Sequence, residues 1–182
     1  MEDSRLSARR GAVHPCELPS GALLQRHRAS GAYADCYRAD VGHVVSHADY
    51  VEAFYTSALF KLERLILRAF AARGSTDAQA ASLARGEADV FAAWSVEARA
   101  PNQLLLCDLT RRTRSWLMVA PLPGGTRLYF GSAVVPVADP RSGALRLGFG
   151  FSALLGFHKL YSRALLSAAR SRLALPAVKP NL

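Results

Sequence analysis

A helical pattern runs along the chain from Ser46 to Phe70. Apolar or small residues recur there every three or four positions, and charged residues occupy the opposite side. Ser46, followed by Asp49 three residues later, resembles a capping box, and Gly74 is expected to end the helix in the left-handed conformation. A shorter helix is expected from Ser75 to Arg85, ending at Gly86.

The pattern then changes to the alternation of apolar and polar residues that is typical of β-strands. Turn residues separate the successive runs, notably Pro101-Asn102 and Pro123-Gly124-Gly125. A further long helical pattern follows the strands, from about Phe151 to Leu173. Strands are expected over residues 34–41, 90–98, 103–109, 113–120, 126–137 and 144–148.

The predicted order is a strand, two helices, four or five antiparallel strands and a long C-terminal helix. Runs of strands between helices indicate an α+β fold in which the helices cover one face of an antiparallel sheet. A curved sheet and a long helix cannot touch everywhere, so we expect a cavity between them. Residues 1–31 are expected to form a flexible N-terminal arm, residues 32–175 a single domain, and residues 176–182 a tail.

Composition supports a globular, cytoplasmic protein. The chain has 182 residues, of which 51% are hydrophobic and 20% charged. We expect neither a disulfide framework nor a zinc site, because the three cysteines are odd in number and lack CxxC spacing. The N-terminus lacks the apolar core of a secretory signal, and the apolar stretch from Leu147 to Phe157 is too short to cross a bilayer.

The net charge of +9 raises the question of an anionic partner. Nearly all the basic residues are arginines, which indicates a bias of the whole chain rather than a selected patch. Most of the excess charge lies in residues 1–31 and 139–182, on the tails and on one face of the last helix. We therefore expect no specific nucleic-acid binding and at most a weak contact with an anionic surface.

Three stretches of the strand region carry a resemblance to a known superfamily. They are Leu104-Leu105-Leu106-Cys107-Asp108, Ser115-Trp116-Leu117 and the segment from Gly125 to Val134. Together with the order of elements over residues 33–173, they resemble the helix-grip fold of the START-like (SRPBCC) superfamily, and look like an uncharacterised bacterial branch of it, a domain of unknown function.

The resemblance implies a curved antiparallel sheet packed around a long C-terminal helix, with a hydrophobic ligand between them. The superfamily includes lipid and hormone binders, polyketide cyclases and other lyases, and hydroxylase subunits with a separate iron domain. That iron domain needs Cys/His pairs, which this chain lacks, so we expect no cofactor and no metal. No catalytic motif unites the superfamily, so no family site is carried over.

The last helix carries the candidate catalytic residues. Leu154, His158, Tyr161 and Leu165 fall on one face, which we expect to point toward the sheet. His158 could exchange protons near neutral pH with Tyr161 as its hydrogen-bonding partner, or it could be a structural histidine. His43 and His47 have the spacing of metal ligands only if both lie on one helix, which Ser46 as a cap argues against.

Large side chains on the strands complete the candidate site. We expect ligand contacts from Trp94, Trp116, Met118 and Tyr129, although the same residues could simply fill the core. Cys107 alternates with Leu105, and this more apolar set is expected to face the interior. Asp108 is then expected at the rim, paired with Arg112 or Arg114.

The favoured function is binding of a hydrophobic small molecule or lipid beneath the C-terminal helix. The alternative is an enzyme of the polyketide cyclase or isomerase type, with His158 and Tyr161 as acid and base. Binding of an anionic surface through arginines and a purely structural or partner-binding role also remain open.

Overall fold

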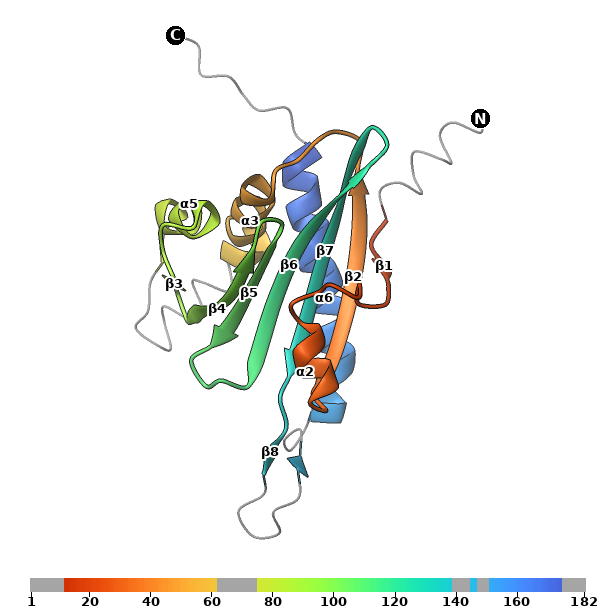
Figure 1. Ribbon diagram of the computed structural model, residues 1–182, viewed down its shortest axis with the longest axis vertical. Helices are drawn as coiled ribbons and strands as arrows, with labels where there is room; N and C mark the ends of the chain where they lie inside the picture. Colours follow the sequence, from red (N-terminus) through yellow and green to blue (C-terminus); the bar gives the residue numbers. More distant parts are fainter. Residues whose placement is uncertain (1–11, 62–74, 139–144, 147–150, 175–182) are drawn as a thin grey trace.

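An antiparallel sheet of seven strands forms the centre of the protein, in the order β1-β2-β7-β6-β5-β4-β3 (Figure 1). The computed structural model describes residues 12–61, 75–138, 145–146 and 151–174. The strands of the large sheet are β1 (His14–Pro15), β2 (Tyr33–Val41), β3 (Val90–Phe91), β4 (Trp94–Ala100), β5 (Gln103–Asp108), β6 (Thr113–Leu122) and β7 (Gly125–Val134). Two further strands, β8 (Val137–Ala138) and β9 (Leu145–Arg146), pair with each other.

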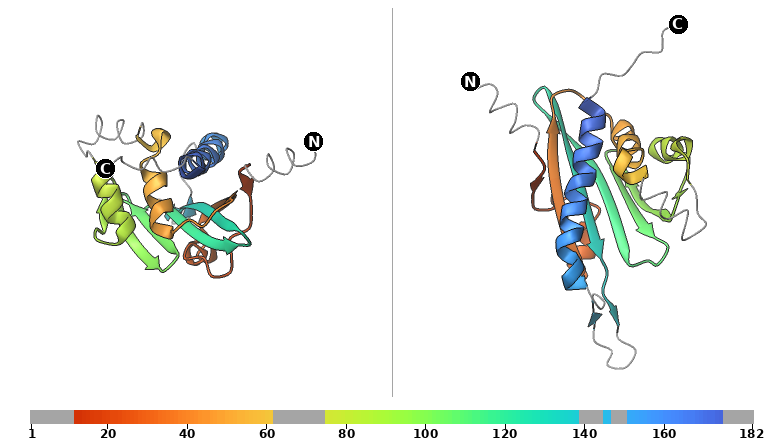
Figure 2. Two further views of the ribbon diagram at one scale, coloured as in Figure 1. Left: turned by 90° about the horizontal axis from the view of Figure 1, so that it is seen from above. Right: turned by 180° about the vertical axis from the view of Figure 1, so that it is seen from behind.

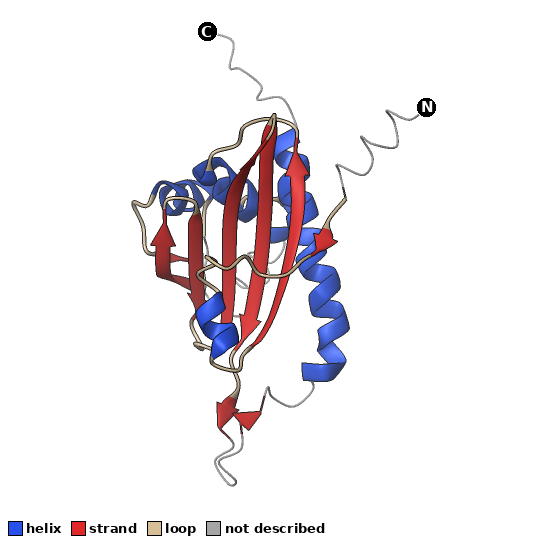
Figure 3. Ribbon diagram, turned by 45° about the vertical axis from the view of Figure 1, so that its right-hand side comes forward, coloured by secondary structure: helices blue, strands red, loops and turns tan. Residues whose placement is uncertain are grey.

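Helices cover both faces of the curved sheet (Figure 2). The helices are α2 (Gln25–Ala29), α3 (His47–Tyr55), α5 (Asp77–Arg85) and α6 (Phe151–Ala174). Helices α3, α5 and α6 lie on one face, which we call the helix face, and α2 lies on the other, the outer face (Figure 3). The α+β class and the predicted helix-grip arrangement of a curved sheet around a long C-terminal helix are confirmed.

Strand alternation supplies a separate hydrophobic layer to each face of the sheet. Leu104 and Leu106 of β5 are buried on the helix face, whereas Leu105 between them is buried on the outer face. The outer layer consists chiefly of Leu18, Leu24, Leu105, Trp116 and Met118. A sheet that is apolar on both sides needs a cover on both sides, and residues 12–32 provide the second cover.

The prediction of a flexible arm is therefore wrong for residues 12–31. Leu24 is fully buried, and β1 pairs with β2 by the register His14↔Arg38 and Pro15↔Tyr37. The apolar residues of this segment follow no helix or strand period, so the hydrophobic pattern did not predict that they pack against the sheet. Residues 1–11 lie outside the described part of the chain.

The predicted helix over residues 46–70 is interrupted after α3. Ser46 caps α3 as predicted, its side chain accepting a hydrogen bond from the backbone N–H of Asp49. The helix ends because the Thr56 hydroxyl donates to the carbonyl of Glu52 and the Ser57 hydroxyl to that of Phe54. Residues 58–61 are helical again, and Gly74, the predicted cap, lies outside the described residues.

The helix predicted over residues 75–85 is confirmed as α5. Thr76 and Gln79 form a capping box, and Gly86 ends the helix with a φ of 79°. The strand predicted over residues 90–98 is instead two strands, because Phe91 pairs directly with Trp94 across a tight turn in which Ala92 has a φ of 53°. Among the described residues, none of the helices is long and apolar enough to cross a membrane.

Candidate functional site

A cavity of about 180 Å³, which we call the internal cavity although it is partly open to solvent, lies between α6 and the helix face of the sheet. Aromatic side chains form much of its wall, and Phe54 and Phe130 pack against each other with ring centroids 4.9 Å apart. Polar groups from β6, β7 and α6 also reach it. The lining consists of Phe54, Phe60, Trp94, Thr113, Arg114, Ser115, Phe130, Ser132, His158, Tyr161, Ser162 and Leu165.

A hydrogen-bonded cluster of Asp35, Ser132 and His158 lies at one side of this cavity. The Ser132 hydroxyl donates to Asp35 Oδ1 at 2.7 Å, and His158 Nε2 lies 2.7 Å from the same hydroxyl oxygen. His158 Nε2 also lies 3.5 Å from Asp35 Oδ2. Tyr37 adds a hydroxyl that donates to Asp35 Oδ2 at 3.3 Å.

The direction of these hydrogen bonds decides what the cluster can do. A serine hydroxyl has one proton, and Ser132 gives it to Asp35, so His158 Nε2 must carry the proton that it shares with Ser132. His158 is therefore a proton donor at Nε2, with the Asp35 carboxylate 3.5 Å away. Because His158 donates to Ser132, its Nε2 is not the base that activates the serine of a catalytic triad.

The side chains of this cluster are largely buried. The Asp35 side chain is only 9% exposed and that of His158 26%. The Tyr33 ring makes an edge contact with His158, with centroids 6.4 Å apart. Burial and, to a smaller extent, the charge of Asp35 raise the pKa of Tyr33 to about 12, so Tyr33 remains a neutral phenol at physiological pH.

Three of the predicted site residues meet at this cavity: Trp94, His158 and Tyr161. The Trp94 indole Nε1 is buried without a hydrogen-bonding partner. Tyr161 stacks on Phe157, with centroids 6.0 Å apart and planes 9° apart. The partners of His158 Nε2 include Ser132 and Asp35.

The other predicted contacts lie away from the cavity. Trp116, Met118 and Tyr129 belong to the outer face, where the Trp116 indole N–H donates to Gln103 Oε1 at 2.8 Å. Cys107 is buried and shares the strand face of Leu105, which is also the outer face. The side chain of Leu154 lies outside the described part of the structure. The error arose because both strand faces are apolar, so hydrophobicity did not identify the inner one.

Asp35 and Ser132 are functional candidates that the sequence reasoning missed. Each is a polar residue at an inward-facing position of a strand whose inward neighbours are apolar, such as Tyr37 and Phe130. A polar residue at such a position, where the alternation predicts an apolar one, can be recognised in the sequence as a candidate functional residue. Asp108 accepts backbone hydrogen bonds from Arg112 and Thr113 and thus shapes the turn before β6.

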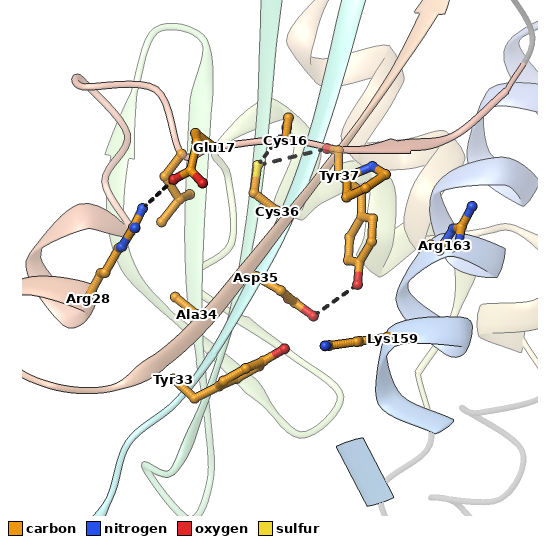
Figure 4. Close-up of a pocket in the computed structure, with 12 residues that line it drawn as sticks. Cys16, Glu17, Arg28, Tyr33, Ala34, Asp35, Cys36, Tyr37, Lys159 and Arg163 are labelled. Atoms are coloured by element: carbon orange, nitrogen blue, oxygen red, sulfur yellow. Dashed lines mark hydrogen bonds and ion pairs between the residues drawn. The ribbon is translucent and has the colours of Figure 1, made fainter. Parts of the chain in front are cut away.

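A second, larger space, also open to solvent, lies at the edge of β2 where its short pairing with β1 ends (Figure 4). This groove has a volume of about 430 Å³ and lies among the N-terminal segment, β2 and the basic side of α6. Asp35 lines the groove, while its partners Ser132 and His158 line the internal cavity. The cluster therefore separates the two spaces. The groove is lined by Pro15, Cys16, Glu17, Leu18, Arg28, Tyr33, Ala34, Asp35, Cys36, Tyr37, Lys159 and Arg163.

The described residues near these two spaces form no cluster of metal ligands. Within the described residues, no three His, Cys, Asp or Glu side chains are grouped so that they could hold a metal ion. His47 is the first residue of α3, and burial lowers its pKa, while His43 precedes the helix.

Comparison with known proteins gives a structural likeness. No family model matches the chain, and no curated protein matches it. The chain is similar to the crystal structure of CalU16 from Micromonospora echinospora, with 12% sequence identity and a TM-score of 0.30. The similarity covers 88% of this chain and 90% of CalU16.

Proposed function

We propose that the protein binds a small apolar molecule in the cavity beneath α6. The observation that carries the proposal is a partly open cavity with an aromatic wall, between the sheet and the C-terminal helix, which His158 and its partner Ser132 also line. The proposal includes membership of the START-like superfamily, in its uncharacterised bacterial branch, and action in the cytoplasm.

The size of the cavity limits the size of the ligand. Ligand sites for drug-sized molecules usually measure about 300–1,000 Å³, whereas an apolar cavity of about 150 Å³ holds benzene. At about 180 Å³, the cavity suits a molecule of one ring better than a lipid chain.

The polar groups of the wall indicate what that ring should carry. A buried N–H without an acceptor costs about 1–3 kcal/mol. The Trp94 indole N–H is such a donor, on a residue that lines the cavity. The N–H has almost no exposed surface, so the indole must turn toward the cavity to meet a ligand oxygen. A ligand oxygen that then accepts from Trp94 would recover this energy, so we propose a one-ring molecule with a carbonyl or similar acceptor.

The indole N–H signals in a nitrogen–proton NMR spectrum test this proposal. We expect acetophenone to shift the Trp94 signal, and ethylbenzene, which lacks an acceptor, to shift it less. The Trp116 signal should stay in place, because its N–H is bound to Gln103 on the outer face. Equal shifts of both indoles, or of neither, would contradict the proposed site.

A cavity-filling substitution provides the matched variant. Ser162 is buried at the cavity, whereas Ser167 is exposed on the same helix. We expect Ser162→Phe to abolish acetophenone binding and Ser167→Phe to preserve it. Binding that persists in a folded Ser162→Phe protein would place the ligand elsewhere.

A cyclase- or isomerase-type activity is the second candidate, and the Asp35–Ser132–His158 cluster favours it. His158 would act as the acid that protonates a ligand carbonyl, with Asp35 and Ser132 holding its ring in place, and Tyr161 would be a second acid or base. The test follows exchange of the methyl hydrogens of acetophenone for deuterium in D2O. Exchange that His158→Ala and Tyr161→Phe reduce would support an enzyme, whereas binding without exchange would leave a binding protein.

A further inference from the structure

Cys16 and Cys36 lie directly opposite each other on neighbouring antiparallel segments. The register of β1 with β2 continues by one residue beyond Pro15, and the backbone N–H of Cys16 donates to the carbonyl of Cys36 at 2.9 Å. Hydrogen-bonded antiparallel pairs have Cα atoms about 5.5 Å apart, which is a usual separation for a disulfide. The two Sγ atoms are 3.3 Å apart, and both cysteines are free thiols in this structure.

The two thiols differ in access and in charge. Cys16 is half-buried and lines the open groove, whereas Cys36 is buried at 4% exposure behind it (Figure 4). The hydrogen bond with Cys36 lowers the pKa of Cys16 against the opposing effect of burial, and the charges of Arg38 and Arg127 lower it further. The same pairing, followed by burial, raises the pKa of Cys36. Cys16 is thus the nucleophile of the pair.

The third cysteine of the chain provides a contrast. Cys107 lies on β5 and is 6% exposed. Burial raises the pKa of its thiol, and its Sγ donates to the carbonyl of Asp108 rather than to another sulfur. A thiol of this kind reacts slowly with oxidants.

We propose that Cys16 and Cys36 form a reversible disulfide when the protein meets a peroxide. The Cys16 thiolate attacks one oxygen of the peroxide, the O–O bond breaks, and the released hydroxide takes up a proton to become water. Cys36 then attacks the sulfenic sulfur of Cys16, so that the S–S bond forms as the S–O bond breaks and a second water leaves. Two thiols lose two electrons, and one hydrogen peroxide becomes two waters.

The disulfide would fix the cover of the outer face to the sheet. It would close a loop of residues 16–36, which contains α2 and the buried Leu18 and Leu24. A cross-link stabilises the folded state mainly by restricting the unfolded chain. The oxidised protein should therefore unfold at a higher temperature than the reduced protein.

Peptide mapping of the full-length protein tests the linkage. The native protein is treated with hydrogen peroxide, free thiols are then alkylated, and trypsin is added. Cleavage after Arg10, Arg26, Arg28 and Arg38 places Cys16 and Cys36 in different peptides, so a disulfide appears as a linked pair that a dithiol reductant separates. We expect this linked pair together with an alkylated Cys107.

Thermal unfolding of matched variants completes the test. We expect oxidation to raise the midpoint in the wild type and in Cys107→Ser, and to leave it unchanged in Cys16→Ser. Cys16→Ser changes a half-buried residue, so its folding is not in doubt, and Cys36→Ala serves as the second variant. Peroxide treatment that yields only sulfinic acid at Cys16, or that modifies Cys107 as fast as Cys16, would overturn the proposal. So would equal midpoints for the reduced and oxidised wild type.

Discussion

His47 is a partly buried histidine at the beginning of a helix. Its Nε2 is buried without a hydrogen-bonding partner, and it is the first residue of α3. Burial lowers its pKa, the charge of Arg99 adds to this effect, and the backbone of Leu117 opposes it. A protonated imidazole here would also meet the positive end of the helix dipole.

Acid should therefore destabilise the protein through His47. The ordinary pKa of 6.5 applies in the unfolded chain, which takes up the proton first as the pH falls. We expect the free energy of unfolding to be unaffected by His47 above about pH 7 and to decrease as the pH falls below 6.5. Urea denaturation at pH 7.5 and pH 5 should show a smaller loss for His47→Gln than for the wild type. Equal losses would mean that His47 has an unperturbed pKa.

Gly125 shows how closely the β6–β7 hairpin approaches the end of β2. A Cβ added at Gly125 would lie 2.2 Å from the backbone oxygen of Val41, so the backbone would have to move. We expect Gly125→Ala to lower the free energy of unfolding by about 1–3 kcal/mol, the usual range for overpacking. Gly42→Ala is the control, because a Cβ there has no neighbour within 4 Å. Urea denaturation of both variants measures the difference, and equal stabilities would refute the close contact.

At the scale of the element, one carboxylate attaches α2 to the sheet. Glu97 accepts hydrogen bonds from Arg26 and His27 of α2 and from Arg114 of β6, the last at 2.8 Å. Burial alone would raise the pKa of Glu97, but the hydrogen bonds from His27 and Arg114 leave it lowered. The Arg114 side chain is only 11% exposed, so its charge depends on Glu97 for compensation.

Removal of that charge should loosen α2. We expect Glu97→Gln to lower the free energy of unfolding by about 1–3 kcal/mol, because hydrogen bonds between charged groups are lost around a buried arginine. Glu17→Gln is the matched control, since Glu17 is 86% exposed and pairs with Arg28 on the surface. Denaturation gives the stability, and faster hydrogen exchange of the α2 amides in Glu97→Gln would locate the effect. Exchange unchanged in α2 would show that the segment is held by apolar contacts alone.

The sequence predicted the elements well wherever one periodicity ran through them. The pattern of β5, β6 and α6 defined those elements to within a few residues, and the Ser46 and Gly86 caps are those of the structure. Where side-chain hydrogen bonds to the backbone interrupt a helix, as at Thr56, the hydrophobic pattern did not predict the interruption. Alternation also separates two strand faces without telling which is inside, and Trp94 lies on the helix face whereas Trp116 lies on the outer face.

The candidate site was predictable only in part for a related reason. His158 stood out because it interrupts an apolar helical face. Its partners Asp35 and Ser132 lie 123 and 26 residues away in sequence, and only the pairing of β2 with β7, which places Asp35 opposite Ser132, joins them. A contact that depends on strand register cannot be read from local periodicity.

At the scale of the whole molecule, the excess positive charge lies partly along α6. Lys159, Arg163 and Arg172 are exposed there, on the side away from the internal cavity. We expect weak sedimentation with vesicles of anionic phosphatidylglycerol at low salt, and none at physiological salt, because exposed charges are screened. Zwitterionic vesicles are the control. Sedimentation that survives physiological salt would indicate a specific lipid site.

The pairing of β2 with β7 also governs the order of events during synthesis. In the strand order, β7 lies between β2 and the strands β6, β5, β4 and β3. Residues Thr126 to Val134 of β7 pair with β2. The two strands are separated by more than 80 residues, as the pairing of Val41 with Thr126 shows. At about 5–20 residues per second, a ribosome needs several seconds to supply that interval. During this time β2 and the apolar segment before it have no sheet to join, so this protein should depend on chaperones more than its length suggests.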